Sequence, residues 1–158
     1  MSDSSTTTIH QDVLLRPTIS YTQASKIIEA TIAFAQEKNL RLSMVVLDTG
    51  GHVVSSARMD GAGFVTIEVA RGKAFAVIAT GGTPGDVLAK RYEENPMVWG
   101  NVASLGYGAP LLPARGSSPI YLNGALIGAI GASGAPSELD ELAVRAGIAA
   151  IGAEDTPQ

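Results

Sequence analysis

The sequence predicts an α+β fold, a layered sandwich in which helices flank a central, mostly antiparallel sheet. Two pairs of apolar segments are each joined by a short turn, as in β-hairpins. Segments with apolar residues at helical spacing precede, separate and follow those pairs. Because the apolar faces of a sheet need cover, the helices must pack on it in layers. We expect one domain at residues 19–152, with a flexible leader at 1–18 and a flexible tail at 153–158.

Composition excludes several classes of function. The chain of 158 residues has no cysteine, which rules out disulfides and thiolate metal centres. A net charge of −4 without any cluster of Lys and Arg does not suit a partner made of nucleic acid. The polar start lacks the pattern of a signal peptide, and no apolar run approaches the roughly 20 residues of a membrane helix. We therefore expect a cytoplasmic protein without a membrane partner.

The first elements are a helix and a hairpin. Ser20 and Gln23 have the spacing of a reciprocal helix cap, and apolar residues follow at helical spacing until the helix ends near Asn39. Residues 42–47 are apolar apart from Ser43, as expected of a strand covered on both faces. A turn at 48–51 leads into a return strand at 52–58.

The middle of the chain predicts two helices and a long loop. A helix at 65–80 is stopped by two glycines, and Thr83 and Pro84 begin a short amphipathic helix at 86–94. Pro96 should end that helix. Glycines and prolines scattered through 97–117 predict a loop, and loops of this length are often functional.

The last elements are a hairpin and a helix. Asn123 and Gly124 form the dipeptide that most readily takes a tight hairpin turn. The strand after the turn contains glycines at 128, 131 and 134, which indicates that a ligand, a helix or a subunit approaches the main chain. A final helix follows at 137–152.

Lys73 is the most unusual candidate site residue. It falls on the apolar arc of the helix at 65–80, and a cation on a buried face needs a partner. The lysine either snorkels or pairs with a carboxylate of a neighbouring subunit, or it binds an anion or shuttles protons at a pocket wall.

Arg58, Asp60 and Arg115 are further candidates. Arg58 and Asp60 bracket a strand end before a glycine-rich bend, where they either point into a site or form an ion pair that fixes the bend. Arg115 lies in the long loop, where its planar fork suits a carboxylate ligand, although a plain surface arginine fits equally well.

Polar residues also gather where the last strand passes into the last helix. Ser137 can cap that helix, and acids in its first turn are favoured by the helix dipole. Ser133 and Glu138 are candidates for ligand contact, and Glu138 with Glu141 has a spacing that could hold a cation. Backbone N–H groups near residue 134 could instead hold an anion.

Histidines do not indicate a metal site. His10 and His52 lie far apart without metal-ligand spacing, so we expect no metal ion bound by the protein alone. A haem could take His10, His52, Met59 or Tyr107 as an axial ligand, or none of them.

The segments 45–52, 58–62, 73–74 and 124–134, taken in this order and spacing, resemble the GlcG/HbpS family over about 19–151. The resemblance implies a profilin-like layered domain with a central antiparallel sheet, and assembly into a homo-oligomer. This chain departs from the family pattern at 115–118, where relatives typically have a diglycine before the proline, and at Leu139, where many have Gln.

The resemblance implies a small-ligand binding protein whose ligand is haem or a related tetrapyrrole. The carboxylates of that ligand would meet Arg58, Lys73 and Arg115, and the small residues of 128–134 would lie along it. The Asp60 bend and Ser133 would flank one pocket.

The alternative is a cofactor-independent enzyme acting on a small oxygenated acid or ketone. Lys73 or Asp60 would handle protons, an arginine would neutralise developing charge, and Ser133 or Glu138 would orient the substrate. A purely oligomeric scaffold is a third interpretation.

Overall fold

The computed structural model describes residues 12–157, so the first part of the expected leader, with His10, lies outside the described residues. It confirms the α+β class. In chain order the elements are α1 (Tyr21–Glu37), β1 (Ser43–Asp48), β2 (Val53–Arg58), α2 (Thr66–Ala79), α3 (Gly85–Glu94), α4 (Pro96–Ala103), β3 (Ser117–Leu122), β4 (Ala125–Ser133) and α5 (Ser137–Ala149).

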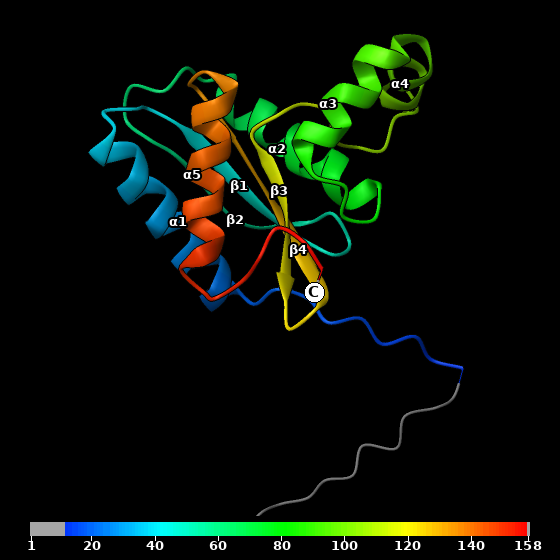
Figure 1. The fold of residues 1–158 in the computed structure, drawn as a ribbon, viewed down its shortest axis with the longest axis horizontal. Helices are drawn as coiled ribbons and strands as arrows, with labels where there is room; N and C mark the ends of the chain where they lie inside the picture. Colours follow the sequence, from blue (N-terminus) through cyan, green and yellow to red (C-terminus); the bar gives the residue numbers. More distant parts are fainter. Residues whose placement is uncertain (1–11, 158) are drawn as a thin grey trace, which may run out of the picture.

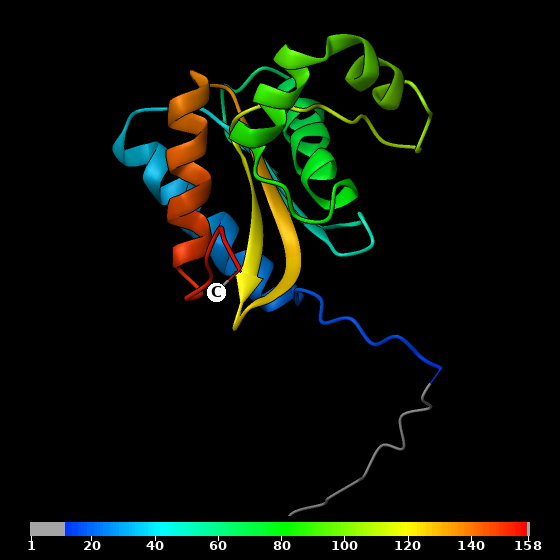
Figure 2. The same ribbon diagram turned by 45° about the vertical axis from the view of Figure 1, so that its right-hand side comes forward.

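The sheet has the strand order β2-β1-β4-β3, and every neighbouring pair is antiparallel. Helices α1 and α5 lie side by side on one face, and α2 covers the other (Figures 1 and 2). Alternate residues of β1 enter the two cores: Met44 and Val46 pack on the α1 and α5 side, whereas Val45 and Leu47 pack under α2. The burial of β1 on both faces was correctly predicted from its continuous apolar run.

The predicted start of α1 is confirmed. The side chain of Ser20 accepts a hydrogen bond from the backbone N–H of Gln23 at 3.1 Å, and the Gln23 side chain bonds back to the Ser20 N–H. The helix ends at Glu37, and Asn39 then takes a positive φ of 56°. This left-handed turn directs the chain into β1.

The hairpin between β3 and β4 also forms as predicted. Asn123 and Gly124 have φ values of 51° and 78°, as a two-residue turn with both central residues left-handed requires. The turn sets Leu122 opposite Ala125.

The glycines of β4 admit other parts of the same chain. A Cβ at residue 131 would collide with the Ala70 carbonyl oxygen and come within 2.9 Å of the Ala74 nitrogen, both in the α2 backbone. A Cβ at Gly134 would collide with the Arg41 carbonyl oxygen. Gly131 therefore admits a neighbouring helix, as one of the alternatives held, whereas Gly134, just after β4, admits the segment that leads into β1. Contact of residues 128–134 with a ligand stays a prediction.

The loop predicted at 97–117 is wrong over its first part, where α4 forms. Pro96 occupies the first turn of α4, and the Asn95 side chain accepts a hydrogen bond from the Val98 N–H at 3.5 Å. A proline cannot continue α3, but its fixed φ suits the start of the next helix. Helices α3 and α4 form an arm that projects from the body of the molecule, and residues 104–116 return from it without helix or strand (Figure 1).

The last helix starts where it was predicted, but the residue that caps it is not the predicted one. Pro136, not Ser137, is the N-cap residue, and no side chain caps the helix. The helix ends at Ala149, and the chain then returns to the edge of the sheet, where Tyr121 and Glu154 exchange two backbone hydrogen bonds of 2.8 and 2.9 Å. Ordered contact thus continues past the predicted boundary at residue 152.

At the other end, residues 13–18 form neither helix nor strand. No helix within residues 12–157 is long and apolar enough to cross a membrane.

Candidate functional site

An apolar pocket of about 340 Å³ opens between α2, the projecting arm and the segment that follows it. Leu112 N–H donates to the Gly72 carbonyl at 3.0 Å, which fixes this segment against α2. The polar side-chain groups of the pocket lining are the phenol of Tyr92 and the ammonium group of Lys73. We call this cavity the apolar pocket, and it is lined by Val69, Lys73, Tyr92, Gly100, Ala103, Leu111, Leu112, Pro113 and Ala114.

Lys73 reaches this pocket with its side chain only 8% exposed. Its Nζ donates to the Ala132 carbonyl at 2.9 Å and to Oδ2 of Asp140 at 3.2 Å. The buried cation therefore has its partner in its own chain, and the expected carboxylate of a neighbouring subunit is not needed. A buried charge is tolerated when it is paired and hydrogen-bonded in this way.

Asp140 completes the pair from the first turn of α5. Its side chain is 2% exposed and also accepts a hydrogen bond from the Ala135 N–H at 3.2 Å. Burial raises the pKa of the Asp140 carboxyl above its ordinary value, although the nearby Lys73 charge acts in the opposite direction. Gly116 closes over the pair, since a Cβ there would lie 2.7 Å from Asp140 Cβ and 2.9 Å from Lys73 Nζ.

Arg115 is occupied by acids of its own chain. Its Nε and Nη2 both donate to Oε2 of Glu141, at 2.9 and 2.6 Å, and its Nη1 donates to Glu138 at 3.2 Å. The hydrogen bond with Glu141 is the main reason that the pKa of Arg115 is raised. Arg145 holds the other oxygen of Glu141 at 2.8 Å. The fork of Arg115 and the two acids are thus engaged with side chains of the same chain. Contact of Arg115 or Glu138 with a ligand stays a prediction.

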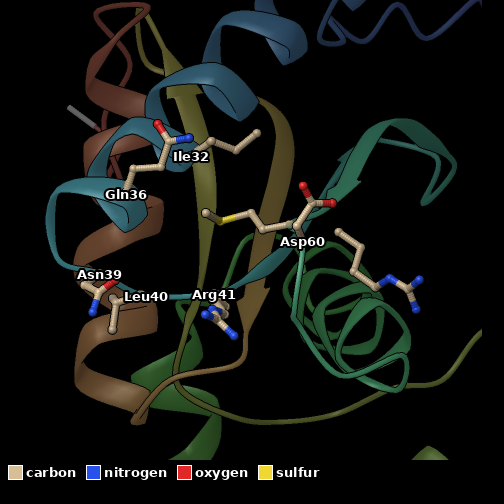
Figure 3. Close-up of a pocket in the computed structure, with 8 residues that line it drawn as sticks. Ile32, Gln36, Asn39, Leu40, Arg41 and Asp60 are labelled. Atoms are coloured by element: carbon tan, nitrogen blue, oxygen red, sulfur yellow. The ribbon is translucent and has the colours of Figure 1, made fainter.

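Arg58 and Asp60 lie in a different cavity, an open polar hollow of about 510 Å³ beside α1. Figure 3 shows Gln36 and Ile32 of α1 on one side of this hollow and Asp60 on the opposite side. Within the described part of the chain Arg58 and Asp60 form no ion pair, so the expected pairing across the bend is wrong. We call this cavity the polar hollow, and it is lined by Ile32, Gln36, Asn39, Leu40, Arg41, Arg58, Met59 and Asp60.

Ser133 lines neither cavity. It stands opposite Ser43, which in turn stands opposite Arg58, so the three residues form one row across β4, β1 and β2. The Ser43 hydroxyl is hydrogen-bonded to the Thr66 hydroxyl at 2.8 Å. The single pocket expected between the Asp60 bend and Ser133 is therefore divided, with Lys73 in one cavity and Asp60 in the other. These two candidate proton-transfer groups do not share a site.

Among the described residues, the candidate axial ligands of a haem also lie outside the apolar pocket. His52 is an exposed residue beside Asp48, and Tyr107 packs against the ring of Phe75 at 5.7 Å between centroids. The Met59 sulfur accepts a hydrogen bond from the Leu42 N–H at 3.5 Å and belongs to the polar hollow. Tyr92 is the phenol of the apolar pocket, and the sequence reasoning missed it. Its position four residues after the buried Leu88 places it on the apolar stripe of α3, which is a signal the sequence did contain.

No three His, Cys, Asp or Glu side chains gather into a possible metal site within residues 12–157. The carboxylates near α5 are neutralised by arginine and lysine side chains instead.

Comparison with known sequences finds one family and several relatives. Residues 19–149 match the family model described as haem degrading protein HbpS-like. Protein GlcG of Escherichia coli K12 is 34% identical over 116 residues, which are 73% of this chain and 81% of the relative. An uncharacterized 15.0 kDa protein encoded between dhaT and dhaS in Citrobacter freundii is 31% identical over 131 residues, covering 79% of this chain and 86% of the relative.

Solved structures give the same grouping. A crystal structure of HbpS superposes with a TM-score of 0.79 at 30% identity, covering 91% of this chain and 97% of HbpS. A double mutant of Streptomyces reticuli HbpS gives the same TM-score of 0.79 and covers 94% of that chain. A PduOC:heme complex has a TM-score of 0.77 at 24% identity and covers 98% of that chain, a likeness that shows the fold alone.

Proposed function

Because the chain belongs to the HbpS-like family, we propose that it binds haem or a related tetrapyrrole, and that the apolar pocket is the binding site. The observation that carries the proposal is the composition of that pocket, whose lining is apolar and includes the phenol of Tyr92. Its volume of about 340 Å³ lies in the range of small-molecule sites, roughly 300–1,000 Å³.

The residues of the pocket fit a tetrapyrrole by their chemistry. The aliphatic side chains of Val69, Leu111 and Leu112 offer apolar contact to a flat macrocycle and exclude water from its face. Tyr92 is 42% exposed, and its phenol oxygen is the lining group that would hold the haem iron. A bound haem would supply a redox-active iron and a strong absorbance band.

Lys73 is the cation of this lining, and its ammonium group has three N–H donors, of which two are used within the chain, so the third is the proposed donor to a ligand carboxylate. Its ammonium group is held by Asp140 and the Ala132 carbonyl, which fixes its position before any ligand arrives. Arg58 and Arg115 do not line the pocket, and we assign them no contact with the macrocycle.

Titration with haemin tests this proposal. The purified protein should show a sharpened and shifted absorbance band that saturates at one equivalent of haemin. The Tyr92→Phe variant should retain most of the affinity, because the apolar contact persists, but its band should shift because the phenol oxygen would no longer reach the iron. The Tyr107→Phe variant is the matched control, since Tyr107 lies outside the pocket, and its spectrum should equal that of the parent. No saturable band, or equal spectra for both variants, would overturn the proposed site.

A further inference from the structure

The polar hollow has no part in the proposed haem site, and its lining is unlike that of the apolar pocket. Two arginines, Arg41 and Arg58, face it together with one acid, Asp60. Neither arginine forms an ion pair with any carboxylate in residues 12–157, whereas Arg115 and Arg145 are both paired. Two guanidinium groups in one hollow thus have their hydrogen-bonding capacity free.

The Asp60 bend determines where Arg41 lies. Gly61 has a φ of 83°, and a Cβ there would come within 2.8 Å of Arg41 Nη1 and 2.9 Å of Arg41 Cδ. The guanidinium of Arg41 therefore lies against the backbone of Gly61. A residue with a side chain at position 61 would displace the guanidinium. Figure 3 shows Arg41 below Asp60, beside Leu40. The sequence thus keeps a planar donor group in one place at the mouth of the hollow.

The charges of the lining favour an anion. Two arginines and one aspartate leave one net positive charge. Charge alone does not separate a carboxylate from a phosphate dianion, because attraction to the arginines and repulsion from Asp60 both increase with the charge of the ligand. A phosphate ion lacks the carbon skeleton that the apolar side chains of the lining could contact. Arginine forks also match the planar geometry of a carboxylate through two parallel hydrogen bonds.

The remaining groups suggest what the carboxylate is attached to. Asp60 accepts hydrogen bonds when ionised, so it suits a hydroxyl group on the ligand. Ile32, Leu40 and Met59 offer an apolar wall for a short carbon skeleton. We infer that the polar hollow binds a small hydroxycarboxylic acid, with its carboxylate on Arg41 and Arg58 and its hydroxyl on Asp60.

Isothermal titration with four probes tests the inferred chemistry. Racemic lactate should bind saturably. Propionate, which lacks the hydroxyl, should bind several-fold more weakly, and propane-1,2-diol, which lacks the carboxylate, should give no heat of binding. Inorganic phosphate should bind more weakly than lactate. Tighter binding of phosphate, or equal binding of lactate and propionate, would contradict the inference.

Three variants test the assignment of groups. Arg41→Met and Arg58→Met keep the length of the side chain and should each weaken lactate binding by about ten-fold or more, the effect of a lost charged hydrogen bond. Asp60→Ala should remove the preference for lactate over propionate. Arg91→Met, an exposed arginine of α3 outside the hollow, is the control and should bind lactate as the parent does.

Thermal unfolding of each variant checks that the fold is intact, and unchanged lactate affinity in both folded arginine variants would refute the site. Haemin titration of the same variants separates the two proposals, because the two cavities share no lining residue. Loss of lactate binding with haemin binding intact supports this inference alone, and parallel loss of both would contradict it.

Discussion

At the scale of single residues, the buried pair of Lys73 and Asp140 should make a large contribution to stability. Replacing Lys73 by Met would leave a buried acid without its partner, since both side chains are almost fully buried. Breaking such a pair costs about 3–5 kcal/mol. We expect the free energy of unfolding of Lys73→Met, measured in urea, to fall by that amount.

The double variant Lys73→Met, Asp140→Leu is the matched control. It removes both charges, so it should be more stable than the single variant. Equal stability of the single variant and the parent would show that the pair contributes little.

The pH dependence of stability provides a second test of Asp140. Because burial raises the pKa of its carboxyl in the folded state, the folded protein holds this proton more tightly than the unfolded chain. The resulting stability is fully present below the unfolded pKa of about 3.9 and is lost as pH rises through the folded pKa. The stability of the parent relative to Asp140→Asn should therefore decrease as pH rises from about 4. Urea unfolding at a series of pH values measures this difference, and an increase with pH would contradict the assignment.

At the scale of elements, Gly131 sets how closely α2 approaches the sheet. An alanine at 131 would drive its Cβ into the α2 backbone at Ala70 and Ala74. Overpacking of this kind typically costs about 1–3 kcal/mol. Gly131→Ala should lose at least that much stability in urea unfolding.

Gly63→Ala is the control for this substitution. A Cβ at residue 63 would meet only Thr66 Cγ2, at an ordinary distance of 3.9 Å. Its stability should stay close to that of the parent. Similar losses in both variants would show that close packing on α2 is not the role of Gly131.

Local signals in the sequence predicted most of these elements. The Ser20 cap, the apolar run of β1 and the Asn123 turn each depend on residues within a few positions of one another, so each was visible in the sequence. Helix α4 was missed because Pro96 both ends one helix and begins the next. The end of the helical pattern at Pro96 was therefore interpreted as the start of a loop, although a new helix begins there.

The candidate site was predicted less well, because its contacts are not local. Lys73 was correctly singled out as a buried cation, yet its partner Asp140 lies 67 positions away. Glu141 lies 26 positions from Arg115, so nothing near Arg115 indicated that its fork is filled. The division of the expected single pocket into two cavities depends on how α2 and α1 pack on opposite faces of the sheet, which no local pattern encodes.

At the scale of the whole molecule, the projecting arm suggests a surface for a second copy of the chain. No residue of α4 is buried; Met97 in this helix is 77% exposed, and Leu105, two residues after the helix, is 68% exposed. Apolar side chains gathered on one protruding element are typical of protein interfaces. We propose that this arm takes part in the homo-oligomer that the family resemblance implies.

Light scattering on the protein as it elutes from a size-exclusion column measures the mass of its assembly. Met97→Lys with Leu105→Lys should reduce the mass to that of a smaller assembly, because two charges would be placed in the interface. Asn101→Lys adds a charge on the same helix at a residue that is already polar and should leave the mass unchanged. A monomeric parent would contradict the proposed assembly.

Filling the apolar pocket is the sharpest test of whether a tetrapyrrole binds there. Gly100 lines the pocket and no atom lies within 4 Å of a Cβ built there, so the fold accepts a leucine at this wall of the cavity. The measurement is the haemin dissociation constant of Gly100→Leu beside that of the parent. Gly100→Leu, with its unfolding temperature maintained, should bind haemin at least ten-fold more weakly. Equal affinity in the two proteins would contradict binding in the apolar pocket.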